Sequence, residues 1–317
     1  MQSENLCHFC KYFNRKSMKE NKWAYLLLIS LVWGSSFILM KKDLLGLSPI
    51  QIGAFRILIA GSILMFVGAK KIIHIQRKHW RPLFLVAFTA TFFPGFFFAF
   101  AVSQIDSSVS AILNSLTPLI TMLIGFFFFG FSFSRRQVFG VFVGLVGTLL
   151  LIVKSAEINP HQHYEYALLI FLSSIGYAYS LNMIKTKLSD LDALSITVSC
   201  FAVLMLPALL VLVFSGFFND LVWTSEASES LFYVSLLAIV GTAMAKVLFN
   251  RLVQISSPVF SSSVTYLITV VAVAWGMWDG ERLTLYQLFS VVIIFAGVYL
   301  VNKKPKKELL RPAKTVA

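Results

Sequence analysis

Long apolar runs, interrupted by short charged or turn-forming stretches, dominate the pattern of hydrophobic and polar positions along the chain. A helix needs about 20 mostly apolar residues to cross the hydrocarbon core of a bilayer. Divided at the interruptions, the runs predict ten membrane-spanning helices: 23–40, 49–69, 83–103, 108–129, 137–153, 166–184, 193–214, 231–249, 258–278 and 285–301. The fifth and tenth runs are the shortest. The pattern therefore predicts an all-α integral membrane protein with ten transmembrane helices.

The composition supports this interpretation. Hydrophobic residues make up 58% of the chain and charged residues only 13%, whereas an ordinary soluble domain has roughly 25% charged residues. So few charges cannot cover a water-facing surface, which excludes a soluble globular protein. The three cysteines (Cys7, Cys10 and Cys200) are too few and too scattered for a disulfide framework or a zinc site. We expect no metal and no cofactor.

The formal net charge of +13 reflects orientation rather than a nucleic-acid partner. Lys and Arg in short loops stay on the cytoplasmic side of a membrane. Most of the 27 basic residues lie in the N-terminal segment, in the C-terminal tail and in alternate loops between the predicted helices. The longest loop on the other side, 215–230, carries Asp220, Glu226 and Glu229 and no basic residue. Both termini are therefore predicted to be cytoplasmic, with the lipid bilayer as the surrounding partner and no nucleic acid bound.

An internal repeat relates the two halves of the chain. Residues 104–151 align with 254–301 without a gap, and the matches include polar and glycine positions at element boundaries, among them Gln104 with Gln254 and Gly130 with Gly280. The repeat unit contains five predicted helices, and an odd number inverts the second copy in the membrane. The predicted organisation is a cytoplasmic segment 1–22, two five-helix repeats at 23–153 and 166–301, and a basic cytoplasmic tail at 302–317.

Inverted repeats of this kind are typical of secondary transporters, in which two pseudo-symmetric halves expose a central site to each side in turn. A duplicated membrane protein that transports nothing is the alternative. The chain has no G-x-x-x-x-G-K-[ST] sequence for ATP and no H-E-x-x-H or G-x-S-x-G sequence for catalysis. We therefore expect a transporter that does not use ATP itself, and not an enzyme.

Five short motifs resemble the EamA family of the drug/metabolite transporter superfamily: 33–37 (WGSSF), 55–56 (FR), 115–118 (SLTP), 241–245 (GTAMA) and 280–284 (GERLT). The resemblance extends over about residues 23–301. It implies an inverted-repeat fold of ten helices in a bacterial cytoplasmic membrane, monomeric or homodimeric, that carries small metabolites, often amino acids and commonly outward. This chain departs from the pattern where Ile268 stands opposite Pro118 of the repeat, a position expected to lie away from the substrate.

Two basic residues lie well inside predicted spans, where an ionisable group normally faces a cavity or a partner. Lys246 is expected either to line a central cavity and pair with a substrate carboxylate, or to snorkel to the cytoplasmic interface near Arg251. Arg56 is expected either to bind substrate or to bond carbonyls and serines of neighbouring helices. Together they favour zwitterions or anions over bare organic cations.

Uncharged candidates complete the predicted substrate site. Asn114, Asn182 and Asn250 are interpreted either as substrate ligands or as hydrogen-bonding contacts between helices. Trp33, Phe37, Tyr177 and Tyr179 are interpreted either as the wall of a cavity or as ordinary lipid-facing or core residues, since the chain has 31 phenylalanines and is aromatic throughout.

Pro94 and Gly95 are expected to mark a hinge or a static kink, because proline removes a helical hydrogen bond. No acidic residue lies mid-span; Asp43, Asp106, Asp279 and Glu281 all fall at predicted helix ends, so the intramembrane carboxylate of a small multidrug-type proton antiporter is not expected. Facilitated diffusion, exchange and coupling through an edge residue such as Asp106 are the alternatives that this leaves open.

The function these features predict is secondary transport of amino-acid-like zwitterions or organic anions by alternating access, outward. The alternatives are efflux of cationic or multiple drugs and a membrane protein without transport activity.

Overall fold

The computed structural model describes residues 21–131, 134–158, 161–220, 224–281 and 284–302. Within these ranges all regular structure is helical. The first half comprises α2 Lys22–Asp43, α3 Pro49–Gly68, η1 Ala69–His74, α4 Arg77–Ala87, η2 Phe88–Phe92, α5 Phe93–Val102, α6 Ser107–Asn114, α7 Thr117–Phe129 and α8 Arg135–Ile158. The second comprises η3 Tyr164–Tyr166, α9 Ala167–Lys187, α10 Ala193–Phe214, α11 Phe217–Asp220, α12 Ser225–Leu236, η4 Leu237–Met244, α13 Ala245–Ile255, α14 Pro258–Ser262, α15 Val264–Trp278 and α16 Leu285–Asn302.

Among the described residues, eight helical segments are long and apolar enough to cross a membrane: Lys22–Asp43, Pro49–His74, Arg77–Val102, Ser107–Phe129, Tyr164–Lys187, Ala193–Phe214, Ser225–Ile255 and Pro258–Trp278. Each contains or closely matches one predicted run. The two remaining runs correspond to α8 and to α16, whose apolar stretch Leu285–Gly297 is shorter. The all-helical class is confirmed for the described residues, while the count of ten spans and the side of the termini stay predictions. Residues 1–20 and 303–317 lie outside the described residues.

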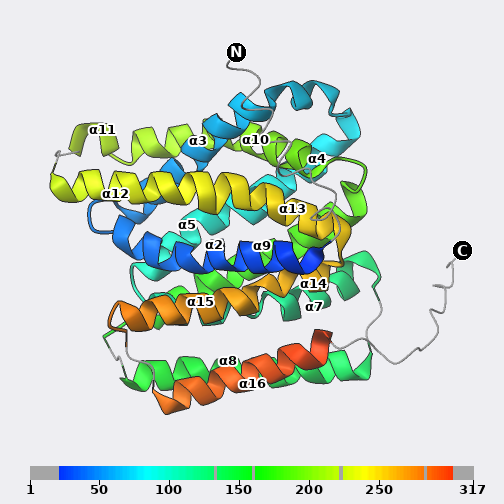
Figure 1. The fold of residues 1–317 in the computed structure, drawn as a ribbon, viewed down its shortest axis with the longest axis vertical. Helices are drawn as coiled ribbons and strands as arrows, with labels where there is room; N and C mark the ends of the chain where they lie inside the picture. Colours follow the sequence, from blue (N-terminus) through cyan, green and yellow to red (C-terminus); the bar gives the residue numbers. More distant parts are fainter. Residues whose placement is uncertain (1–20, 132–133, 159–160, 221–223, 282–283, 303–317) are drawn as a thin grey trace, which may run out of the picture.

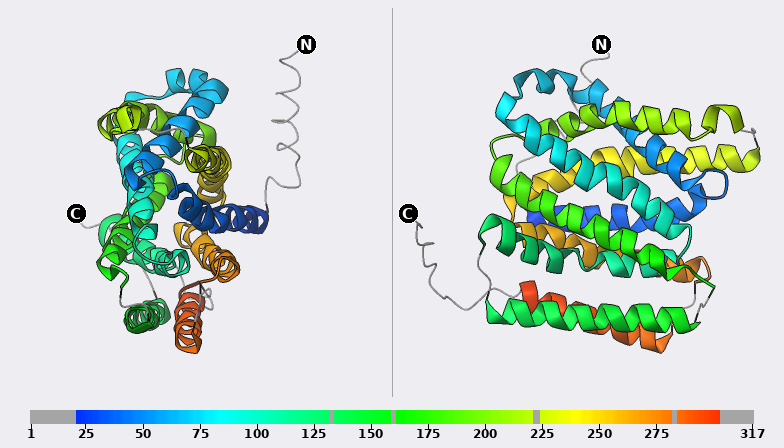
Figure 2. Two further views of the ribbon diagram at one scale, coloured as in Figure 1. Left: turned by 90° about the vertical axis from the view of Figure 1, so that its left-hand side faces the viewer. Right: turned by 180° about the vertical axis from the view of Figure 1, so that it is seen from behind.

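The helices lie side by side along one direction, so the bundle has two ends (Figure 1). The end at which α2 begins is called the Asn21 end below, and the end at which α2 finishes is called the Asp43 end. In both views of Figure 2, α8 and α16 lie together along one edge of the bundle. The remaining helices enclose the buried hydrophobic core, which includes Ile29, Ile57 and Phe201.

Glycines allow α8 and α16 to approach closely. A Cβ added at Gly297 of α16 would collide with the backbone of Gly140 and Gly144 on α8. A Cβ at Gly147 would meet Ile294 in the same way. Small residues spaced in this manner are a common means of packing helices in lipid, where the hydrophobic effect does not hold helices together.

Helix irregularities recur in both halves. The third span of the first half contains a π-helical segment, η2, and the corresponding span of the second half contains another, η4. The chain also leaves α-geometry near residue 115, between α6 and α7, and again at Ser263, between α14 and α15. Gly130 and Gly280, matched in the sequence repeat, both adopt positive φ (69° and 91°) just after α7 and α15. Glycine adopts this conformation without the steric cost that a side chain brings.

Glu281 joins the two halves at the Asp43 end. Its Oε1 accepts from the Ser107 backbone N–H (3.2 Å) and hydroxyl (2.7 Å), and its Oε2 accepts from the Ser108 backbone N–H (3.1 Å) and hydroxyl (2.5 Å). The carboxylate thereby caps α6, whose N-terminal N–H groups favour an anion. Lys41 at the end of α2 pairs with Glu281 (3.1 Å) and with Asp279 (2.8 Å).

Burial alone raises the pKa of Glu281, but hydrogen bonds from Ser108 and Ser107 and the Lys41 ammonium outweigh burial and hold this pKa below its ordinary value of 4.5. Ion pairs also join the halves at the Asn21 end, where Lys71 pairs with Asp192 (2.9 Å) and His79 approaches Asp190 (2.9 Å).

We expect Gly297→Leu to separate α8 from α16 and to destabilise the protein by about 1–3 kcal/mol, the usual range for overpacking. Thermal unfolding of the detergent-purified protein measures the effect as a lower melting temperature. Val292→Leu on the exposed face of α16 is the matched control and should leave the melting temperature unchanged. Equal melting temperatures for the two variants would contradict the close helix contact.

We expect Glu281→Gln to cost about 1.5–3 kcal/mol at neutral pH, because charge-assisted hydrogen bonds in this range are lost. Since the folded pKa is depressed, the stabilisation is present above pH 4.5 and is lost as the pH falls below that value. Melting curves across this range should therefore show wild type converging on the variant at low pH. Glu165→Gln, at an exposed site, is the control. A wild type that keeps its full advantage in acid would overturn this account.

Candidate functional site

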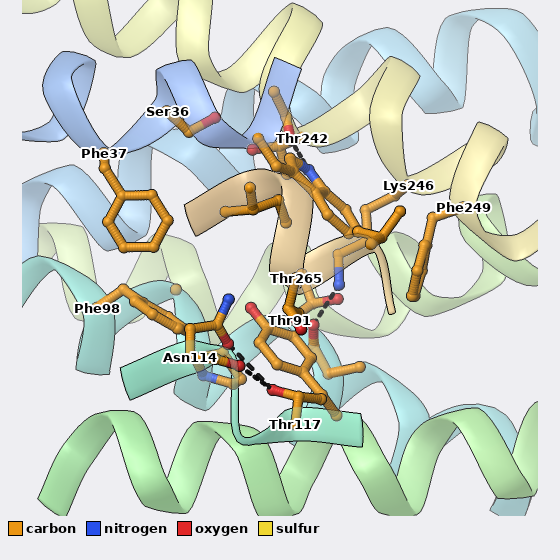
Figure 3. Close-up of a pocket in the computed structure, with 18 of the residues that line it drawn as sticks. Ser36, Phe37, Thr91, Phe98, Asn114, Thr117, Thr242, Lys246, Phe249 and Thr265 are labelled. Carbon is orange, nitrogen blue, oxygen red and sulfur yellow. Dashed lines mark hydrogen bonds between the residues drawn. The ribbon is translucent and has the colours of Figure 1, made fainter. Parts of the chain in front are cut away.

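A cavity lies in the middle of the bundle, with about 860 Å³ of empty space including its open part. Its wall comes from both halves of the chain: Trp33, Ser36, Phe37, Met40, Arg56, Ile57, Ala90, Thr91, Pro94, Gly95, Phe98, Asn114 and Thr117 from the first, and Tyr177, Leu181, Gly241, Thr242, Lys246, Phe249, Ser262, Val264, Thr265 and Ile268 from the second. Figure 3 shows Phe37 and Phe98 on one side of this space and Lys246 and Phe249 on the other.

Lys246 bonds to the irregular backbone of the third span. Its Nζ donates to the carbonyl oxygen of Ala90 in η2. In an α-helix this carbonyl would accept from the residue four positions later, which is Pro94 and has no N–H. The ammonium therefore provides a donor at the position where proline removes one. Lys246 projects into the cavity wall, and the alternative in which it snorkels to the Arg251 interface is not what the structure shows.

Trp33 makes a similar contact, from a side chain of the first half to the backbone of the second. Its indole Nε1 donates to the carbonyl of Gly241 in η4 (2.7 Å). Trp33 belongs to the first half and Gly241 to the second, whereas Lys246 belongs to the second half and Ala90 to the first. The two π-helical segments are thus each bonded by a cavity side chain from the opposite half.

Aromatic rings surround the ammonium of Lys246. Its Nζ lies 5.2 Å from the ring centroid of Tyr177 and 5.8 Å from that of Trp33, both within the range of cation–π attraction. The Trp33 ring also lies 4.8 Å from the ring of Phe249. These rings fix the direction in which the ammonium group faces the cavity.

Arg56 enters the cavity from α3 and has weak partners. One terminal nitrogen donates to Thr242 Oγ1 at 3.4 Å, the other approaches Met40 Sδ at 3.7 Å, and the buried Nε has no hydrogen-bond partner among the described residues. The guanidinium thus lines the cavity, as one interpretation of the sequence expects, and contacts neighbouring helices, as the other expects. The contacts of its terminal nitrogens are long, and no carboxylate is among them.

The predicted aromatic and asparagine candidates divide into two groups. Trp33, Phe37, Tyr177 and Asn114 line the cavity, as do the predicted hinge residues Pro94 and Gly95. Phe37 packs edge-on against Phe98 (5.7 Å between centroids), and Asn114 Oδ1 accepts from the Thr117 hydroxyl (3.2 Å).

The other three candidates lie elsewhere. Asn182 donates to the Thr121 and Ala178 carbonyls, and Tyr179 packs near Phe129, both outside this cavity wall. Asn250 donates to Thr197 Oγ1 (2.9 Å) and lines a smaller adjoining pocket of about 390 Å³.

Sequence reasoning missed several wall residues, namely Ser36, Met40, Thr91, Phe98, Thr117, Thr242, Phe249 and Thr265. Phe98 and Phe249 carry no signal that separates them from other phenylalanines. Thr117 and Thr242 did carry such a signal in the sequence, since both lie in the motifs that suggested the family. Ile268, which was expected to lie away from the substrate, lines this cavity.

Asp43 lies at a helix end, as expected, and the structure buries it there. It is the last residue of α2, its exposed fraction is 0%, and neither carboxylate oxygen has a hydrogen-bond partner among the described residues. A carboxylate at the end of a span is therefore fully buried in this fold.

Known proteins resemble the chain over most of its length. The E. coli (strain K12) protein called "Uncharacterized inner membrane transporter YedA" is 25% identical over 88% of this chain and 92% of its own. The Salmonella typhimurium protein called "Probable amino-acid metabolite efflux pump" is 27% identical over 86% of this chain and 92% of its own. A solved crystal structure covers 90% of this chain and 96% of its own with a TM-score of 0.60 at 17% identity, which establishes a shared fold.

The family comparison agrees with the resemblance noted in the motifs. The model of the EamA-like transporter family matches twice, at residues 22–153 and 165–303. Together the two matches cover nearly the whole chain, and relatives are named as transporters or efflux pumps. The chain therefore belongs to the EamA-like transporter family, whose members point to transport across a membrane rather than to enzymatic activity.

Proposed function

We propose that the protein is a secondary transporter of small zwitterionic or anionic metabolites, with the cavity as its substrate site. The observation that carries the proposal is the charge of the wall: Arg56 and Lys246 face the cavity, and the described residues of its lining include no carboxylate. Such a site attracts a carboxylate or another anion and repels a bare cation. The aromatic wall adds apolar surface for the remainder of a small metabolite.

Amino-acid-like substrates fit this chemistry. A carboxylate can accept from the terminal nitrogens of Arg56, whose own contacts are long, and replace Ala90 as the acceptor for Lys246. The Asn114 side chain and the hydroxyl of Thr91 supply neutral polar groups nearby. Outward transport is supported by the efflux pump of Salmonella typhimurium among the relatives.

Alternating access is supported by the ion pairs that join the two halves at each end of the bundle. Lys41 with Glu281 at the Asp43 end and Lys71 with Asp192 at the Asn21 end both join the two segments that match the family. Opening one set while the other stays closed exposes the cavity to one side at a time. We propose that this occurs in a ten-span inverted repeat of a bacterial cytoplasmic membrane, with both termini cytoplasmic and the protein monomeric or homodimeric.

We expect Lys246→Met to reduce strongly the stabilisation by anionic or zwitterionic ligands at a given ligand concentration. A charge-assisted hydrogen bond is worth about 1.5–3 kcal/mol, so affinity should fall by about 10- to 100-fold. The measurement is the melting temperature of the detergent-purified protein with amino acids, organic acids, nucleosides and cationic drugs, because a ligand of the folded state raises it. Arg56→Gln should give the same loss.

The matched control is Lys185→Met. Lys185 also donates to backbone carbonyls, those of Val253 and Gln254, but it does not line the cavity. This variant should keep the wild-type response to ligands, whatever its own stability. Stabilisation by cations alone, or an equal response in Lys246→Met and wild type, contradicts the proposed substrate class.

A further inference from the structure

Asp43 is a buried acid for which the cavity site provides no role. Both carboxylate oxygens are buried and unpartnered among the described residues, and the side chain does not line the cavity. An ionised carboxylate without a hydrogen bond is costly in a low-dielectric interior, whereas the neutral acid is tolerated far better. The position therefore suits a group that exchanges a proton.

Arg56 connects this acid to the cavity. The guanidinium lines the cavity and interacts electrostatically with Asp43, but the two groups form no ion pair. Met40, one turn before Asp43 on α2, contacts Arg56 and also lines the cavity. A positive Arg56 favours an ionised Asp43, and burial opposes it.

Other charged groups near this end of α2 are engaged elsewhere. Lys41 and Lys42 pair with Asp279 and Glu281 from the loop after α15. From α12, Glu229 bonds to Tyr233, which also lies near Lys42. The ionisable residues of the elements packed against α2 are thus Glu226, Glu229 and Tyr233 on α12, Lys246 and Arg251 on α13, Tyr266 on α15, and Asp279 and Glu281 after it, to which Arg56 of α3 is added by its contact with Met40. Of these, Arg56 is the one whose charge acts on the Asp43 carboxylate.

We propose that Asp43 is a proton-binding site coupled through Arg56 to occupancy of the cavity by an anionic group. An anion that binds the guanidinium offsets its charge, so the carboxylate loses its electrostatic support and takes up one proton on an oxygen. By linkage, the proton then favours the anion to the same extent. The inference rests on the proposed function and specifies it: a proton moves together with the substrate anion.

The first test needs no substrate. Infrared spectra of the detergent-purified protein, with ¹³C-labelled aspartate, are recorded from about pH 5 to about pH 9. We expect a protonated-carboxyl band that Asp43→Asn lacks and that Asp192→Asn, altered at an exposed ion pair, retains. Arg56→Gln removes the positive charge as an anion would, and should move the disappearance of the band to higher pH by about one unit, which is a tenfold change in proton affinity.

The outcomes of this test are decisive in both directions. A band that depends on Asp43 and moves in Arg56→Gln supports the site. The proposal is overturned if no aspartate band in this range depends on Asp43, or if the band keeps its midpoint in Arg56→Gln.

A second test addresses transport. Proteoliposomes receive a mixture of the twenty standard amino acids, radiolabelled, with and without an imposed pH gradient. We expect the gradient to drive uptake by wild type and to lose its effect in Asp43→Asn, while exchange of amino acid for amino acid continues in the variant. Wild-type uptake that ignores the gradient overturns the coupling and leaves the proposed function intact. Wild-type protein that moves none of the mixture counts against the proposed substrates, and the infrared result still decides the proton site.

Discussion

A backbone carbonyl that leaves the helical pattern inside a bilayer has no water to bond and must find another donor. The helices around the cavity leave α-geometry at η2 and η4, and side chains from the opposite half supply donors there, Lys246 to Ala90 and Trp33 to Gly241. These two bonds therefore satisfy irregular backbone and connect the two halves in the same place. A group that draws Lys246 away from Ala90 alters both the backbone pairing of η2 and the connection between the halves, so the cavity contents and the packing of the halves are physically linked.

The two basic side chains of the cavity also have few interaction partners. Arg56 contacts a threonine hydroxyl and a thioether instead of a carboxylate, and its Nε has no hydrogen-bond partner among the described residues. Lys246 has a neutral carbonyl and aromatic faces. Neither cation is neutralised by an ion pair in the described structure, whereas Lys41 and Lys71 at the two ends of the bundle are paired. Positive charge is thus kept available in the cavity and cancelled at the ends.

The charged residues of the cavity could be identified from the sequence, because a lysine or arginine inside an apolar run stands out from its neighbours. Phe98 and Phe249 could not be separated from the other phenylalanines, since helices apolar on all sides give no periodicity from which to assign a cavity face. Tyr177 and Tyr179 show the same limit: two residues apart, they point about 200° apart on a helix, and only one lines the cavity. The burial of Asp43 likewise depends on tertiary packing, which position along a helix does not reveal.

Lys246 also stands between two spaces. The large cavity and the smaller pocket share Ala90, Thr91, Tyr177, Leu181, Lys246 and Phe249 in their walls, and Asn250 and Cys200 lie on the far side of this shared wall. Because the Lys246 side chain belongs to both walls, any displacement of it from Ala90 changes the shape of the two spaces at once.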